Sequence, residues 1–229
     1  MEETPKYTVY RTKRKNIRMV LRANGTLSVY CPKRCPVSEI EAMVSKNYAR
    51  LSKLHNEKAD KLFTDATNRS FSLPYLGKRY PITYGNTKKL CFNGEMFIAK
   101  DGCDRETLRC EYVEFLRAAA KKALPQLLKS YADAHGFEYS SVRIKSTSSR
   151  YGSCSAKKNI NLSLALMACD RDFIRFVILH ELCHTVHMNH SENFYLLLEK
   201  VCPDHKALNN IGKKLYSGIT SYINYRPCP

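Results

Sequence analysis

Two histidines and a glutamate lie inside a segment that is otherwise almost entirely apolar. Apolar side chains surround the helix predicted over residues 171–188 on nearly every face, which is typical of a buried helix, and Asp170 can cap its start. The middle of this segment reads His180-Glu181-Leu182-Cys183-His184. Polar groups are costly to bury unless they are paired or bind a metal ion. The segment therefore predicts a buried helix built around a metal site.

The spacing of these three polar residues favours a zinc site. His180 and His184 are four residues apart, so both imidazoles leave one face of the helix and can hold a single ion. Glu181 lies about 100° around the helix from His180, where it can hold a metal-bound water without being a ligand. An accidental H-E-x-x-H is expected in roughly one chain of this composition in a hundred. The alternative, two core histidines bonded to neighbours, explains the buried setting less well.

A catalytic zinc ion needs three protein ligands and one open position. His187 lies about 10.5 Å along the helix from His180, too far to share the ion. We expect His190 to be the third ligand, which requires the helix to end and the chain to turn back. Asn189 can make that turn because asparagine tolerates the left-handed conformation, and Glu192 is the fallback ligand. His187 is then exposed, directed at substrate, or placed beside the ligands.

The rest of the chain predicts an α+β fold with a boundary near residue 105. Residues 1–105 are expected to form a β-rich region that contains one helix. Residues 106–229 are expected to form the domain that carries the metal site. The boundary is placed where strand-like alternation gives way to helical spacing of the apolar residues.

Hairpin signals dominate the first region. Alternating apolar residues flank Asn24-Gly25, a residue pair that favours the tight turn of a hairpin, and a second hairpin is expected over residues 91–100 with its turn at Asn93-Gly94. A capping box that begins at Ser38 predicts a helix over residues 38–58. Further strands are expected within residues 71–84.

The second region alternates helices with short strands. A long helix is expected from about residue 106 to Gly136, and Pro125 either kinks it or starts a new one. The elements that follow are predicted as a strand at 142–146, a connector at 148–158, a strand at 160–166, and helices that follow the metal helix from 191 and from 205.

The chain is strongly basic, with 38 Lys and Arg against 21 Asp and Glu and a net charge of +17. Such a charge predicts an anionic partner, most simply nucleic acid, although a solvated basic surface is the plain alternative. The excess is spread along the chain and is largest in the first 60 residues. No apolar run approaches the roughly 18 residues of a membrane span, so we expect no membrane partner. The oligomeric state stays open.

Residues 1–6 show no basic stretch followed by an apolar one, so we expect no secretory signal to accompany the ten cysteines. Several lie inside apolar patterns, so buried free thiols in a reducing cytoplasm are the expected state. We therefore expect a cytoplasmic protein. The pairs Cys31/Cys35 and Cys103/Cys110 lack the two-residue spacing of a zinc knuckle.

Three motifs in the second half resemble those of the YgjP-like zinc metallopeptidases, also described as predicted metal-dependent hydrolases. The motifs are His180-Glu181-x-x-His184-x5-His190 with Ser191-x-x-Phe194, Arg150-Tyr151-Gly152-Ser153-Cys154, and Pro203-Asp204-His205-Lys206. The resemblance is close in the C-terminal half and loose over the N-terminal hairpins. It implies a zincin-like core with a backing helix, a small antiparallel sheet, the H-E-x-x-H helix and a helix after the third ligand.

Departures from the family pattern concern the cleft more than the metal. Tyr151 stands where the family usually has tryptophan, and Ser163 stands where asparagine is expected. The spacing also overlaps that of metzincins, but those have glycine where this chain has His187.

The resemblance and the residues together imply a zinc-dependent metallopeptidase that hydrolyses polypeptides. Zinc would lower the pKa of its bound water, and Glu181 would act as general base and then general acid. Candidates for stabilising the transition state or contacting substrate are Arg150, Tyr151, His187 and Tyr195. The strand at residues 160–166 is expected to be the edge on which an extended peptide pairs.

Three alternatives remain open at this point. The histidine spacing is also similar to that of the YbeY family of ribonucleases, which generally lack a carboxylate at the position of Glu181. SprT-like and WLM proteases share H-E-x-x-H and act on proteins attached to DNA, so a protease that works near nucleic acid would suit the charge. The third alternative is a non-catalytic nucleic-acid-binding protein with a structural zinc, for which Cys183 would be a poorly directed fourth ligand.

Overall fold

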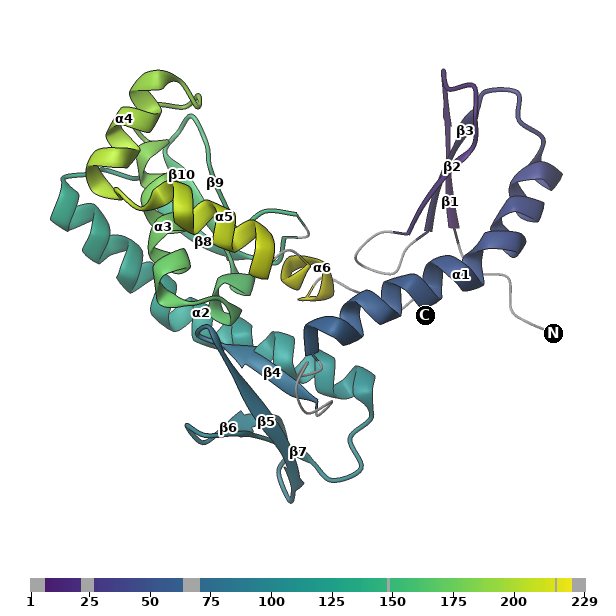
Figure 1. Ribbon diagram of the computed structural model, residues 1–229, viewed down its shortest axis with the longest axis horizontal. Helices are drawn as coiled ribbons and strands as arrows, with labels where there is room; N and C mark the ends of the chain where they lie inside the picture. Colours follow the sequence, from purple (N-terminus) through teal and green to yellow (C-terminus); the bar gives the residue numbers. More distant parts are fainter. Residues whose placement is uncertain (1–6, 22–26, 64–70, 148, 217, 224–229) are drawn as a thin grey trace. The chain divides into compact units, whose positions relative to one another are not determined.

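The computed structural model describes residues 7–21, 27–63, 71–147, 149–216 and 218–223. The chain forms two compact units, and its mixture of helices and strands confirms the predicted α and β composition (Figure 1). The first unit contains the described residues up to Leu62, and the second spans Phe63–Ile223. The boundary predicted near residue 105 falls inside the second unit, at the start of helix α2 (Arg105–His135).

The first unit is a three-stranded sheet and a helix. The central strand β3 pairs in parallel with β1 and antiparallel with β2. The antiparallel pair confirms the predicted hairpin strands, whereas its Asn24-Gly25 turn lies outside the described residues and β1 was not predicted. The elements are β1 (Tyr7–Thr12), β2 (Arg18–Leu21), β3 (Leu27–Pro32) and α1 (Val37–Phe63).

The core of this unit forms between one face of β3 and the first turns of α1. Leu27, Val29 and Cys31 alternate along β3 and cluster with Ile40 and Val44 of the helix. The helix begins at Val37, so Ser38 lies within the first turn and the predicted capping box is wrong.

The second unit begins with a four-stranded sheet in the order β4-β5-β7-β6. Leu76 and Gly77 turn β4 into β5 with φ values of 47° and 78°, the left-handed pair that a type I′ hairpin turn needs. The predicted Asn93 turn joins β6 to β7, and its side-chain oxygen accepts the backbone N–H groups of Glu95 and Met96, each at 2.9 Å. The strands are β4 (Ser72–Tyr75), β5 (Lys78–Gly85), β6 (Cys91–Phe92) and β7 (Phe97–Lys100).

Aromatic contacts join this sheet to α2 and explain why the predicted boundary lies inside one unit. The ring of Phe115 on α2 is 5.1 Å from the rings of both Tyr75 and Phe97. Tyr112, also on α2, is fully buried and donates its hydroxyl hydrogen to the carbonyl of Pro74. The change from strand to helix near residue 105 is therefore a change of local pattern within one shared core.

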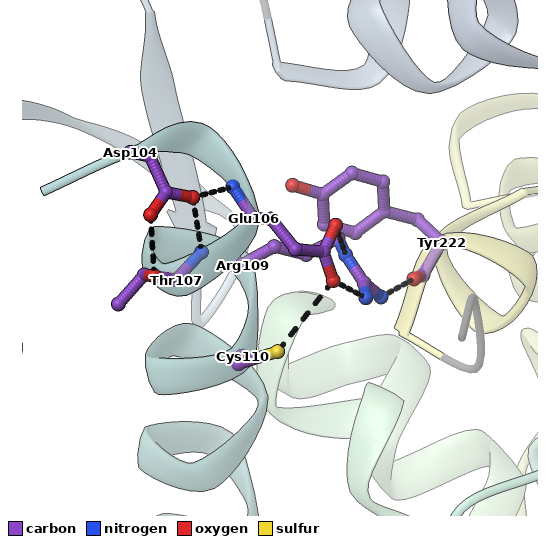
Figure 2. A network of polar contacts seen from close by, with 6 residues as sticks. All are labelled: Asp104, Glu106, Thr107, Arg109, Cys110 and Tyr222. Atoms are coloured by element: carbon purple, nitrogen blue, oxygen red, sulfur yellow. Dashed lines mark hydrogen bonds and ion pairs between the residues drawn. The ribbon is translucent and has the colours of Figure 1, made fainter. Parts of the chain in front are cut away.

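Helix α2 is capped at both ends and passes through Pro125 without ending. Asp104 accepts the backbone N–H groups of Glu106 and Thr107, each at 2.9 Å, and Gly136 closes the helix with a left-handed φ of 70°. Figure 2 shows how the N-terminal end of α2, near Asp104, contacts helix α6 (Ile219–Ile223). Buried Arg109 pairs with Glu106 and donates to the carbonyl of Tyr222 at 3.3 Å.

A second sheet in this unit has the order β8-β10-β9. β10 pairs in parallel with β8 and antiparallel with β9, so the small antiparallel sheet that we predicted is in fact mixed. β9 lies within the predicted connector at 148–158. The strands are β8 (Ser141–Lys145), β9 (Gly152–Cys154) and β10 (Asn159–Ser163).

The central position of β10 overturns one prediction about substrate binding. A strand with neighbours on both sides has no free backbone edge, so residues 160–166 cannot pair with an extended peptide. The strand is also shorter than predicted. Ser163 accepts the backbone N–H of Ala165 at 3.2 Å and starts a 3₁₀ turn, η1 (Leu164–Ala168).

Three further helices complete the second unit, and α3 packs against α2, β9 and both of the helices that follow it. None of the helices in the described part of the chain has an apolar stretch long enough to cross a bilayer. The helices are α3 (Arg171–Cys183), α4 (Glu192–Val201) and α5 (His205–Leu215).

Candidate metal centre

The helix α3 carries the H-E-x-x-H segment at its C-terminal end. Asp170 caps its start by accepting the backbone N–H of Phe173 at 2.7 Å. The helix ends at Cys183, earlier than the predicted residue 188. Thr185 donates its hydroxyl hydrogen to the carbonyl of Leu182 at 2.7 Å, and the chain turns over residues 184–186.

This early turn brings His190 back to the helix. Asn189, which we expected to make the turn in a left-handed conformation, does not have a positive φ. The turn is made by backbone groups that fold back on the last helical residues, among them the N–H of His187, which donates to Cys183 at 2.9 Å. Ending the helix sooner shortens the path to His190, so no left-handed residue is needed.

Three imidazole nitrogens converge at the end of α3. His180 Nε2 is 3.2 Å from His184 Nε2 and 3.1 Å from His190 Nε2. One ligand atom from each ring lies within 4.8 Å of the others. His184 Nδ1 is 3.0 Å from the carbonyl of His187, which places its proton on Nδ1 and leaves Nε2 as a bare acceptor.

The arrangement fits a divalent cation. One proton on His180 could bridge to only one of its two neighbours, whereas a cation satisfies all three nitrogens. Nitrogens about 2.0–2.1 Å from a tetrahedral zinc ion are about 3.3 Å apart, close to the spacing found here. Burial, followed by the repulsion that His184 and His190 would exert if protonated, lowers the pKa of His180 to about 3, and burial also lowers the pKa of His184. Both rings are therefore neutral at physiological pH, the form that binds metal.

Phe194 packs against all three imidazoles. Its ring is fully buried, stacks on His184 at 4.5 Å between centroids, and lies 5.0 Å from His180 and 4.8 Å from His190. It comes from α4, the helix that follows the third histidine. The sequence interpretation noted Phe194 only as part of a motif, because its contact with all three rings depends on the chain reversal.

Glu181 lies buried beside this cluster. Its side chain is 5% exposed, and Oε2 has no hydrogen-bond partner. Burial raises the pKa of the Glu181 carboxyl to about 8, and the positive charge of Arg150 opposes the shift. The carboxyl group rests on the backbone of Gly152 in β9, where any Cβ would stand 2.4 Å from Oε1. A glycine inside a strand was the available signal for this close approach.

The predicted contact residues differ in where they lie. Arg150 is exposed and acts electrostatically on Glu181, and Tyr195 is 46% exposed with its ring 6.1 Å from that of His190. His187 is half-buried. The hydroxyl of Tyr151 is already engaged in another hydrogen bond, since it donates to the carbonyl of Tyr216 at 2.6 Å. Glu192, the fallback ligand, is exposed at the start of α4 and does not belong to the histidine cluster.

A further buried histidine stands near the cluster and was not predicted as a site residue. His205 is 4% exposed, its Nδ1 is 3.1 Å from the carbonyl of Cys202, and its Nε2 has no partner. An ion pair of 2.7 Å between Arg175 of α3 and Asp204 holds this part of α5 on the metal helix.

The YgjP-like metallopeptidase domain matches residues 15–213. The crystal structure of the metallopeptidase zymogen abylysin from Pyrococcus abyssi is 27% identical over 41% of this chain and 95% of its own, with a TM-score of 0.37. No curated protein matches the chain. Because the family match spans most of the sequence, the chain belongs to the YgjP-like metallopeptidases.

Proposed function

We propose that this metallopeptidase uses zinc to hydrolyse polypeptides, with Glu181 as the general base. The observation that carries the proposal is the convergence of three imidazole nitrogens beside a buried carboxylate with an unpartnered oxygen. A structural site would be closed by a fourth protein ligand. No such ligand belongs to the cluster among the residues that the structure describes.

His180, His184 and His190 would hold the metal. Three imidazoles with an open position are a donor set typical of catalytic zinc. When bound, zinc supplies a Lewis acid that makes a water molecule more acidic and polarises the scissile carbonyl. The hydrogen bond from His184 to the carbonyl of His187 would fix the ring orientation, and Phe194 would support all three rings from behind.

Glu181 would transfer a proton from water to the leaving amine. Its free Oε2 can accept a proton from water and return it to the leaving amine. Burial alone favours the neutral acid, but a cation beside the group favours the carboxylate. Arg150 acts in the same direction, so the loaded enzyme would have a base at neutral pH.

An extended polypeptide would pair with β9. This strand is at the edge of the described sheet, because β10 is its sole strand neighbour there. Gly152 at its start contacts the Glu181 carboxyl, so a chain paired with β9 would pass close to the base. Arg150, His187 and Tyr195 are candidates for contacts to the developing oxyanion, whereas Tyr151 is already bonded elsewhere.

The metal assignment is tested by elemental analysis of protein purified without added metal. We expect about one zinc ion per chain, and a clear loss in His190→Ala. Glu192→Gln serves as the control, because it changes the fallback ligand and should keep the metal. Zinc that is absent from the wild type, or unaffected by His190→Ala, would overturn the ligand set.

The base assignment is tested on an unfolded labelled protein substrate. Glu181→Gln should lower turnover by at least about 10²-fold while zinc stays bound. Glu199→Gln makes the same chemical change at an exposed position on α4 and should leave activity intact. Loss of zinc together with activity in Glu181→Gln would refute the role of base. An RNA substrate is offered in parallel, and cleavage of RNA instead of protein would favour the nuclease.

A further inference from the structure

The outer face of the first unit's sheet carries a row of two tyrosines and an arginine. Leu27, Val29 and Cys31 of β3 face α1, so Tyr30, which lies between the last two, faces the other way. Tyr10 of β1 and Arg18 of β2 are the register partners of Tyr30 on its two sides. The three side chains therefore stand in one row across the sheet, on the face away from the helix.

The two tyrosine rings form a stack. Their centroids are 5.0 Å apart and their planes differ by 17°. The guanidinium of Arg14 lies 5.8 Å from the centroid of the Tyr30 ring. Tyr10, on the edge strand, is 40% exposed. An arginine and two aromatic rings in series form a platform on which a further flat ring can stack.

Basic residues gather at one end of the same sheet. β1 and β3 are parallel and end together, and β2 begins beside the end of β3 because it is antiparallel. The residues that follow β1 and β3 and those that start β2 therefore lie at the same end of the sheet. Arg11 links the segments at this end by donating to the carbonyls of Lys33 and Cys35 at 2.9 and 2.8 Å. The exposed basic residues there are Lys13, Arg14, Lys15, Arg18, Lys33 and Arg34.

This basic charge has no acidic counterpart in the surrounding sequence. Between Thr4 and Ser38 the chain has nine Lys and Arg residues and no Asp or Glu. The first acidic residue after that stretch, Glu39, accepts a hydrogen bond from the thiol of Cys35 at 3.5 Å. An ordinary solvated surface carries both positive and negative side chains, so this excess of positive charge indicates a polyanionic ligand.

We propose that this face binds single-stranded nucleic acid. A base would stack on the Tyr10–Tyr30 pair, and Arg14, Arg18 and the neighbouring lysines would neutralise phosphates. A single strand is required because the bases of a duplex are already stacked on one another and present no face to tyrosine. The proposal concerns the first unit and does not depend on the chemistry of the metal centre.

The first test measures fluorescence anisotropy of a labelled oligothymidylate of about 12 nucleotides with the full chain. Tyr10→Ala should weaken binding about tenfold, whereas Tyr10→Phe keeps the ring and should bind like the wild type. A duplex of the same length should bind less tightly than the single strand. Equal binding by Tyr10→Ala and the wild type, or preference for the duplex, would overturn the stacking platform.

The second test separates this surface from general positive charge. Binding is measured between about 50 and 200 mM salt. The double variant Arg14→Gln/Arg18→Gln should weaken binding and reduce the slope of log affinity against log salt by about 1.4, or about 0.7 per phosphate contact. Lys121→Gln/Lys122→Gln removes the same charge from exposed positions on α2 and should change neither. An equal effect of both variants would refute the site.

Two further outcomes are informative. Binding to anionic phosphatidylserine vesicles that is lost in Tyr10→Ala, without binding to the oligonucleotide, would replace the nucleic acid with a lipid surface. Glu181→Gln should bind the oligonucleotide like the wild type, so failure of the proposed peptidase and failure of this proposal can be told apart. Loss of oligonucleotide binding in Glu181→Gln would contradict a site confined to the first unit.

Discussion

Gly152 and Glu181 are in backbone-to-carboxyl contact: a Cβ at residue 152 would stand 2.4 Å from Glu181 Oε1 and 2.7 Å from Cδ. The contact joins the edge strand β9 to the metal helix α3 at the proposed base. It explains why a strand of three residues begins with glycine, which otherwise weakens a strand. The position of the Glu181 carboxyl therefore depends on the absence of a side chain at Gly152 in β9.

The first prediction follows from this contact. In Gly152→Ala the new methyl group would displace the Glu181 carboxyl, because the glycine backbone is held by pairing with β10. A shift of about 1 Å in a catalytic group can cost about 10²-fold in rate, so we expect a loss of that order in kcat. Zinc content should be unchanged. Ser153→Ala on the same strand is the control, and full activity in Gly152→Ala would contradict the positioning role of the contact.

The second prediction concerns Phe194. Phe194→Leu keeps an apolar side chain but removes the flat ring that stacks on His184, so the imidazoles lose their common support. We expect about tenfold weaker zinc affinity, measured by competition with a chelator, and a loss of about 1 kcal/mol in the free energy of unfolding. Leu198→Val on the same helix should lower stability without changing zinc affinity. An equal loss of affinity in both variants would show that Phe194 supports only the fold.

The third prediction separates Tyr151 from the reaction. Its hydroxyl donates to the carbonyl of Tyr216 and its ring packs edge-on against Phe173 at 5.2 Å. Tyr151→Phe should therefore cost about 1 kcal/mol of unfolding free energy, measured in urea, and leave kcat unchanged. Tyr84→Phe, an exposed position on β5, should affect neither quantity. A fall in kcat of about 10²-fold or more in Tyr151→Phe would place the hydroxyl at the transition state.

The local part of the metal centre could be predicted from the sequence. His180, Glu181 and His184 lie within five residues, so their relative placement depends only on helical geometry. His190 depends on a chain reversal that is made by ordinary residues. The turn is stabilised by hydrogen bonds from Thr185 to the carbonyl of Leu182 and from His184 to the carbonyl of His187. The sequence around these residues contains no turn signal such as Asn-Gly.

Pairing between distant segments explains most of what the sequence could not show. β9 is three residues long and lacks the alternation that marks a strand, since its conformation depends on pairing with β10. The parallel pairing of β10 with β8 places β10 in the centre of the sheet, and no local pattern encodes that order. His205 shows the same limit, because its burial against the metal helix follows from how α5 packs on α3.

The last prediction tests the ion pair that attaches α5 to the metal helix. Asp204 Oδ2 is 2.7 Å from Arg175, and this hydrogen bond lowers the pKa of the carboxyl below its ordinary value of 3.8. The side chain is 47% exposed, so the pair should contribute no more than about 1 kcal/mol at neutral pH. Asp204→Asn should therefore lower the free energy of unfolding by that amount at pH 7.

The pH dependence of this difference has a definite sign. A carboxyl whose pKa is lower in the folded state stabilises the protein fully above the unfolded value of 3.8 and loses that effect as the pH falls through the folded pKa. The gap between wild type and Asp204→Asn, measured by urea unfolding of metal-free protein, should stay constant from neutral pH down to about 4 and shrink below it. Asp133→Asn, whose exposed carboxyl pairs with Lys129 within α2, is the control. A gap that widens in acid would mean that the pKa of Asp204 is higher in the folded than in the unfolded state, which would contradict a stabilising pair with Arg175.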